Sequence, residues 1–149
     1  MSYKVIFKTR WADFDPNKHM RHTAYNDYAA ETRVRFFNDN SLSLKALNNE
    51  NIGPVLFSEN TLFYREITLS EDITVELFLK GLSKNGERFK FVHKIFKQNG
   101  VLAAEIEVYG AWLDLLKRKL SKHPPIQVKT AFDSLEKSED FEMILMKFN

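Results

Sequence analysis

Apolar and polar residues alternate at the start of the chain. The apolar face of this first segment consists of Tyr3, Val5, Phe7, Thr9 and Trp11. Because successive side chains of a strand point to opposite faces, this period of two predicts a strand over residues 3–11. The polar segment 12–23, interrupted by Pro16, predicts a loop.

A helical period replaces the alternation from about residue 24. Its apolar stripe consists of Tyr25, Tyr28, Ala29, Thr32 and Phe36, widened by Ala30, Val34 and Phe37. A stripe this broad is typical of a mostly buried helix. His22 or Thr23 is the expected N-cap, and the helix is expected to end at residues 38–40.

Most of the remaining chain predicts strands. After a short helical stretch within 41–53, the expected strands are 55–67, 73–80, 87–97, 102–112 and 118–121. The pairs Asn85-Gly86 and Asn99-Gly100 predict hairpins with type I′ turns. After residue 125, apolar spacing predicts two helices, one carried by Val128, Ala131, Phe132 and Leu135 and the other by Phe141, Ile144, Leu145 and Phe148.

This order of elements predicts an α+β fold. An isolated apolar helix needs cover, and a curved antiparallel sheet wrapped around one long central helix provides it. We expect a single domain over 1–149, with a core of about 3–123 and a C-terminal helical extension over 124–149. The open sheet edge favours pairing with a second copy, so a homodimer is expected.

Composition narrows the class of protein. The chain has 149 residues, with 44% hydrophobic and 28% charged residues, a net charge of +2, 13 Phe and no Cys. The absence of Cys excludes disulfides and thiol catalysis, and the balanced charge argues against a nucleic-acid partner. No apolar run approaches the ~20 residues of a membrane span, and no signal-peptide core is visible at the start. We therefore expect a cytoplasmic protein without membrane contact, whose Phe residues line either a core or a pocket.

Reactive side chains concentrate in the loop before the long helix. They are Asp13, Asp15, Lys18, His19, Arg21 and His22. The free N–H groups of a helix start polarise a carbonyl, and a carboxylate opposite them acts as a nucleophile or activates water. A thioester suits such a pair because thiolate leaves readily. As an alternative, Asp15 serves only as a turn residue, or Asp13 and Asp15 raise each other's pKa.

Other candidates have simpler interpretations. The spacing of His19 and His22 suits a metal, but no third ligand is evident, and we expect none to bind. His93 is expected to be a hydrogen-bonded core histidine. Two basic stretches predict either solvated surface or a polyphosphate seat; they are Lys84, Arg88, Lys90 and Lys94, and Lys117, Arg118, Lys119, Lys122 and His123.

The loop and helix resemble the hotdog-fold acyl-CoA thioesterases of the 4-hydroxybenzoyl-CoA thioesterase type. That family has the signature Asp-x-x-Gly-His-Val-Asn-Asn-x-x-Tyr, followed by a Tyr, an acidic residue and Arg. The matching residues here are Asp15, His19, Tyr25, Tyr28, Glu31 and Arg33. Weaker similarity lies at 62–67, 71–72, 112–114 and 118–119, so the resemblance covers about 3–123. Lys18 replaces the family's Gly, which commonly serves where φ is positive, and Arg21-His22 replaces Asn-Asn.

The resemblance implies a function. It implies a hotdog dimer or dimer of dimers that hydrolyses an acyl-CoA at the subunit interface, with no cofactor and no metal. The catalytic residues would be Asp15 as nucleophile or base and His22 through its N–H, completed by Tyr25 or His19. Arg88, Lys90 and Lys84 would bind the CoA phosphates, with Arg88 favoured for its bidentate guanidinium. Independently of the resemblance, we expect Glu59, a carboxylate on the following strand, to contact the substrate.

Two rival functions stay open. A hydratase or dehydratase on the same fold would normally carry Asn-Pro-x-His-x-Asp, which this sequence lacks. A non-catalytic acyl-thioester binder is compatible with the changes at Lys18, Arg21 and His22. An assay of thiol release from a panel of acyl-CoAs separates these alternatives from a thioesterase.

Overall fold

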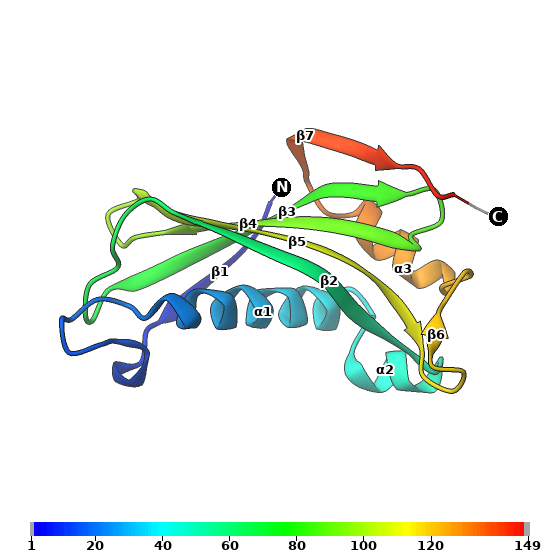
Figure 1. Ribbon diagram of the computed structural model, residues 1–149, viewed down its shortest axis with the longest axis horizontal. Helices are drawn as coiled ribbons and strands as arrows, with labels where there is room; N and C mark the ends of the chain where they lie inside the picture. The colour runs from blue at the N-terminus through cyan, green and yellow to red at the C-terminus, as the bar shows by residue number, and fades with distance from the viewer. Residues whose placement is uncertain (1, 148–149) are drawn as a thin grey trace.

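A curved sheet lies over one long helix in the computed structural model, which describes residues 2–147 (Figure 1). In chain order the elements are β1 (Tyr3–Lys8), the 3-10 turn η1 (Trp11–Asp13), α1 (His22–Asp39), α2 (Leu44–Asn49), β2 (Ile52–Phe63), β3 (Asp72–Ser83), β4 (Arg88–Phe96), β5 (Leu102–Asp114), β6 (Lys119–Leu120), α3 (Ile126–Asp133) and β7 (Lys137–Ile144).

The strands lie in the order β1-β3-β4-β5-β2, and all of these neighbours are antiparallel. One row of facing residues crosses the five strands: Tyr3, Leu77, His93, Ile106 and Thr61. Short β6 pairs with β5, and β7 pairs with β3. Strand β2 has a partner on one side only, so it forms an open edge of the sheet.

Helix α1 lies against the concave side of the sheet (Figure 1). Its buried residues include Tyr25, Tyr28 and Phe36, which come from the stripe expected in the sequence. At its C-terminal end an aromatic cluster of Phe37, Phe89, Phe91, Trp112 and Phe132 has neighbouring ring centroids 5.2–6.2 Å apart. Much of the high Phe content therefore fills the core. The hotdog prediction is confirmed.

The prediction of a second C-terminal helix is wrong. Residues 137–144 form β7, which runs parallel to β3, and Phe148 lies outside the described residues. Strand β1 pairs with β3 only as far as Leu77. The next backbone groups of β3 would lack partners, and β7 supplies them over Leu79–Ser83. The C-terminal extension is thus one helix and one strand.

Three local predictions need correction. Trp11 belongs to a 3-10 turn instead of the first strand, and Arg21 is the residue that precedes α1. At the two hairpins only the glycines have positive φ, +82° at Gly86 and +86° at Gly100. A type I′ turn requires positive φ at both central residues, so these turns have a different geometry. The hairpin between β4 and β5 has a three-residue loop closed by Gly100 in the left-handed region, since Lys97 N–H donates to Val101 O at 2.9 Å.

Within residues 2–147, none of the helices combines the length and apolar character that crossing a membrane requires.

Candidate active site

The loop before α1 is built around Asp15. Its Oδ1 accepts hydrogen bonds from Asn17 N–H at 2.9 Å and from His19 N–H at 3.2 Å. Lys18 closes the turn with φ +67°, a left-handed conformation that favours glycine. The turn therefore has the positive φ for which Gly commonly serves, although a lysine occupies the position. Asp15 is both a turn residue and a partly exposed carboxylate.

The same loop is pinned to the connection between β2 and β3. Met20 N–H donates to Ile67 O at 2.9 Å, and Leu69 N–H donates to Lys18 O at 3.2 Å. Glu71 stabilises this connection by accepting from Thr68 N–H at 2.7 Å and from Lys97 Nζ at 2.8 Å. Burial alone would raise the Glu71 pKa, but these donors lower it to about 2. The position of Asp15 thus depends on residues more than fifty positions away.

The start of α1 faces a cavity of about 400 Å³ that brings the four predicted catalytic residues together. Its lining residues are Asp15, His19, Met20, His22, Tyr25, Phe63, Tyr64, Arg65 and Glu66. No side chain of the described residues caps the helix at Arg21. Ala24 N–H donates to Arg21 O at 3.0 Å, so the N–H groups of His22 and Thr23 are the ones available to a ligand oxygen.

Residues after β2 complete this Asp15 cavity. His19 Nε2 lies 3.0 Å from Glu66 Oε2, and the rings of Tyr25 and Phe63 meet edge to face at 5.1 Å. Burial is the main cause that raises the pKa of the Tyr25 hydroxyl, so this group stays protonated as a donor. Residues 62–67 resemble the family only weakly, and no local sequence pattern indicates that Glu66 pairs with His19.

Asp13 has a structural role. It is fully buried and binds Arg10 Nη2 at 2.7 Å, and it also accepts a short hydrogen bond from the Tyr28 hydroxyl. Burial acts to raise its pKa, but the hydrogen bonds from Arg10 and Tyr28 outweigh it and hold the pKa below its ordinary value. The suggestion that Asp13 and Asp15 raise each other's pKa is therefore wrong for Asp13.

His93 is a core histidine, as expected. Its Nδ1 lies 2.8 Å from Ile106 O and its Nε2 lies 3.2 Å from Arg33 Nη1. The carbonyl can only accept, so Nδ1 carries the proton and Nε2 accepts from Arg33. Burial, followed by the charge of Arg33, lowers the His93 pKa to about 3. The ring is neutral and orients the Arg33 side chain.

Glu59 does not line the Asp15 cavity. Two residues later in β2, Thr61 Oγ1 donates to Asn26 Oδ1 of α1 at 3.0 Å. Alternate residues of a strand share a face, so Glu59 also points toward α1. Its charge raises the pKa of Arg33, partly offsetting the larger lowering by burial. Glu59 therefore belongs to the contact surface between β2 and α1.

The three basic residues predicted to bind the CoA phosphates lie far from Asp15 within one chain. The nine residues of β4 span roughly 26 Å, with Arg88 at its start and the Asp15 loop near its end. Arg88 lies over the Phe57 ring at 5.5 Å, Lys90 pairs with Glu142 at 2.5 Å, and Lys84 is in the preceding turn. One chain does not bring them to Asp15.

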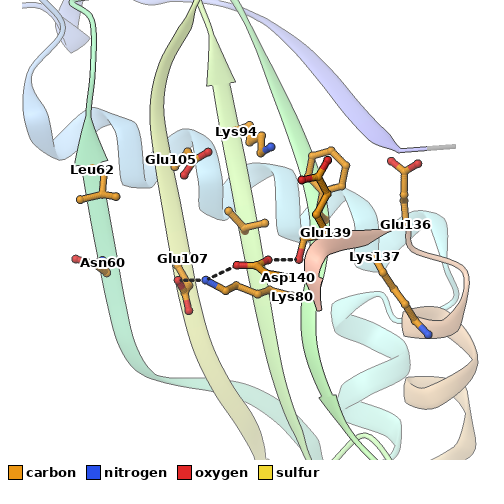
Figure 2. Close-up of a pocket in the computed structure, with 13 residues that line it drawn as sticks. Asn60, Leu62, Lys80, Lys94, Glu105, Glu107, Glu136, Lys137, Glu139 and Asp140 are labelled. Carbon is orange, nitrogen blue, oxygen red and sulfur yellow. Dashed lines mark hydrogen bonds and ion pairs between the residues drawn. The ribbon is translucent and has the colours of Figure 1, made fainter. Parts of the chain in front are cut away.

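A larger groove of about 560 Å³ lies on the side of the sheet opposite α1 (Figure 2). Lys80 bridges Glu107 Oε2 at 2.6 Å and Asp140 Oδ2 at 3.4 Å, as the dashed lines show. The groove thus holds carboxylates and ammonium groups that neutralise one another. Over the described chain, no three potential metal ligands converge there or elsewhere.

Known proteins share this fold. The model of the thioesterase-like superfamily matches residues 9–132, whereas no curated protein matches the sequence. A hypothetical protein of Staphylococcus aureus in complex with CoA has a TM-score of 0.84 at 22% identity, covering 99% of this chain and 90% of that one. A 1,4-dihydroxy-2-naphthoyl-CoA thioesterase from Synechocystis has a TM-score of 0.79 at 17% identity, covering 91% and 98%. A Thermus thermophilus thioesterase complexed with coenzyme A and Zn has a TM-score of 0.73 at 21% identity, covering 89% and 92%.

Proposed function

Because this chain belongs to the thioesterase-like superfamily and is a thioester hydrolase of hotdog fold, we propose that Asp15 and the start of α1 hydrolyse an acyl-CoA. The products are a carboxylic acid and the free thiol. One observation carries the assignment of residues: Asp15, His19, His22 and Tyr25 line a single cavity at a helix start that no side chain caps.

The proposed chemistry divides between the helix and the carboxylate. The thioester oxygen accepts a hydrogen bond from the His22 N–H, and the positive end of α1 stabilises the charge that develops on it. Asp15 removes a proton from a water that adds to the carbonyl carbon, or its free oxygen attacks that carbon directly. The C–S bond then breaks and the thiolate leaves. In the direct route, water subsequently cleaves the acyl-aspartate and restores Asp15.

Tyr25 and His19 position the reacting groups in this proposal. The Tyr25 hydroxyl is a protonated donor held between α1 and Phe63. Glu66 orients the His19 ring from the opposite wall of the cavity. Both residues are therefore supported by contacts outside the loop, and this support favours a fixed geometry around the thioester.

We propose a homodimer formed through the open edge of β2. Antiparallel pairing of two β2 strands would place the start of one copy's β4 toward the end of the other copy's β2. Only this arrangement brings three basic residues of one copy to the CoA bound by the other copy: Arg88, Lys90 and Lys84. Their predicted contacts with the CoA phosphates therefore depend on the dimer. Pairing as a dimer of dimers would leave this edge contact intact.

We further propose one domain over 1–149, with the reaction confined to the core of about 3–123. The seven-stranded sheet is continuous from β1 to β7, which favours this single unit. A cytoplasmic location fits a chain whose sequence, lacking Cys, needs no oxidising compartment for disulfides.

The test is release of thiol from purified protein and a panel of acyl-CoAs. Because the chain has no Cys, a thiol reagent reports only the product, without background from the protein. Thiol release proportional to enzyme concentration supports the proposal, and the preferred acyl group emerges from the panel. Saturable binding without release would favour the acyl-thioester binder, and a change in an enoyl substrate without release would favour the hydratase.

A further inference from the structure

Asp15 borders a second hollow besides the Asp15 cavity. This hollow has a volume of about 460 Å³ and is lined by Trp11, Ala12, Phe14, Asp15, Pro16, Lys18 and Leu69. Among residues 2–147, Asp15 alone lines both spaces. A substrate whose reacting bond lies at Asp15 can therefore extend one of its two ends into the hollow beside Trp11, which we call the Trp11 hollow.

Trp11 presents its indole to solvent from a rigid support. Its side chain is 84% exposed, whereas Trp112 is fully buried. The support is the 3-10 turn η1, closed by Asp13 N–H donating to Arg10 O at 3.0 Å and Phe14 N–H donating to Trp11 O at 3.1 Å. Beneath it, buried Asp13 binds Arg10 at 2.7 Å. These bonds fix the backbone that carries Trp11, and its exposed aromatic face is a ready stacking surface.

Lys18 adds a cation to the same hollow. Its side chain is exposed, and no carboxylate of residues 2–147 forms an ion pair with it. By contrast, Lys4, Lys80, Lys90, Lys97 and Lys129 each pair with an acid within 4.0 Å. The Lys18 ammonium can therefore bind an incoming anion without breaking an internal ion pair.

We propose that Trp11 and Lys18 form the seat for the nucleotide end of the thioester carrier, with the purine base stacked on the indole and the 3′-phosphate bound by the ammonium. The pyrophosphate is then left to the basic residues of the partner subunit proposed above. This inference rests on the proposed acyl-CoA hydrolysis. A nucleotide combines a planar π-face with a phosphate, and it tolerates the open position of Trp11. An aliphatic acyl chain would instead require an enclosed apolar space, and it would leave Lys18 without a function.

Fluorescence of the two tryptophans tests the seat without any hydrolysis. Adenosine 3′,5′-bisphosphate carries the base and phosphate but no thioester. We expect it to quench the emission of exposed Trp11 in a saturable manner and to protect this residue from acrylamide, while buried Trp112 provides a constant background. Trp11→Phe should abolish the ligand-dependent quenching and leave the melting temperature unchanged.

Variants of the two residues sharpen the test. Lys18→Ala should weaken bisphosphate binding severalfold at low salt, and Lys18→Arg should restore most of it. Lys45→Ala, an exposed lysine on α2, serves as the matched control. In kinetics, Trp11→Ala should raise KM for acyl-CoA roughly tenfold or more, the scale of losing one base stack. The same variant should leave kcat/KM for the corresponding acyl-pantetheine unchanged, because that substrate lacks the nucleotide.

Several results would overturn the seat. One is that the bisphosphate does not quench the tryptophan emission. Another is that the quenching is lost in Arg88→Ala but retained in Lys18→Ala. If Trp11→Ala changes the oligomer mass but not the affinity for the nucleotide, Trp11 belongs to an interface between copies and not to a nucleotide seat. The proposed function and the seat fail separately: quenching without thiol release refutes only the hydrolysis, and thiol release without quenching refutes only the seat.

Discussion

Asp15 and His19 are joined in both directions: Asp15 N–H donates to His19 O at 2.9 Å, and His19 N–H donates to Asp15 Oδ1 at 3.2 Å. One carboxylate oxygen therefore holds the loop. No hydrogen bond to Oδ2 is found in the described part of the chain, so this oxygen is available for chemistry. The turn role and the proposed catalytic role of Asp15 are compatible.

Asp15→Asn tests this division of roles. The amide oxygen can accept the same two N–H bonds, so the melting temperature should stay close to that of the wild type. The negative charge is lost, and kcat should fall at least ~10²-fold, the usual scale for an acid–base group. Steady-state thiol release and thermal unfolding give the two readouts. Unchanged turnover would remove Asp15 from the mechanism and direct attention to Glu66, the other carboxylate that lines the cavity.

Lys18→Gly should stabilise the protein. A φ of +67° is unfavourable for an L-residue, by about 1–2 kcal/mol, while glycine loses about 0.5–1 kcal/mol more backbone entropy on folding. The net gain expected in the free energy of unfolding is up to about 1.5 kcal/mol, measured by urea titration. Lys18→Ala removes the same side chain but keeps Cβ, and it should give no such gain.

Tyr28→Phe should destabilise the protein without entering the reaction. The change removes the hydroxyl that donates to buried Asp13, and a hydrogen bond to a charged group contributes about 1.5–3 kcal/mol. Urea unfolding at neutral pH measures the loss. Arg10→Ala, whose guanidinium is largely exposed, should cost less. A smaller loss for Tyr28→Phe than for Arg10→Ala would contradict the proposed anchor.

His93 should make stability fall as the pH is lowered from about 6.5. Its pKa is about 3 in the fold, against 6.5 in the unfolded chain, so between these values the unfolded state binds a proton that the folded state does not. The free energy of unfolding should then decrease by up to about 1.4 kcal/mol per pH unit. His93→Gln should flatten this slope between pH 6.5 and 5. Equal slopes in both proteins would show that His93 does not control it.

Light scattering at micromolar concentration should give at least the mass of a homodimer. Leu62→Lys places a charge on the open edge of β2, where Leu62 is 49% exposed, and charged edges oppose strand pairing. This variant should shift the equilibrium toward monomer. Leu145→Lys, at an 87% exposed position after β7, is the matched control and should keep the wild-type mass. A monomeric wild type would exclude the dimer and, with it, any contribution of Arg88 to a neighbouring site.

The sequence by itself determined the elements whose pattern is local. Alternation set β1 and β5, and the broad stripe from Tyr25 to Phe36 set α1, because strand and helix periods differ and a buried face must be apolar. The candidate site could be predicted from the sequence because its residues are also close together in the chain. Asp15, His19, His22 and Tyr25 lie within one loop and the first turn of one helix, so their proximity follows from chain connectivity.

Only the tertiary structure decided what depends on distant partners. The spacing of Phe141, Ile144 and Leu145 suits a helix, yet residues 137–144 form β7, because the free edge of β3 offers backbone hydrogen bonds that a short isolated helix cannot match. Glu66 meets His19, and Arg33 meets His93 across sixty residues. No periodicity encodes such pairs, since they arise when the sheet curves over α1 and brings separate segments into contact.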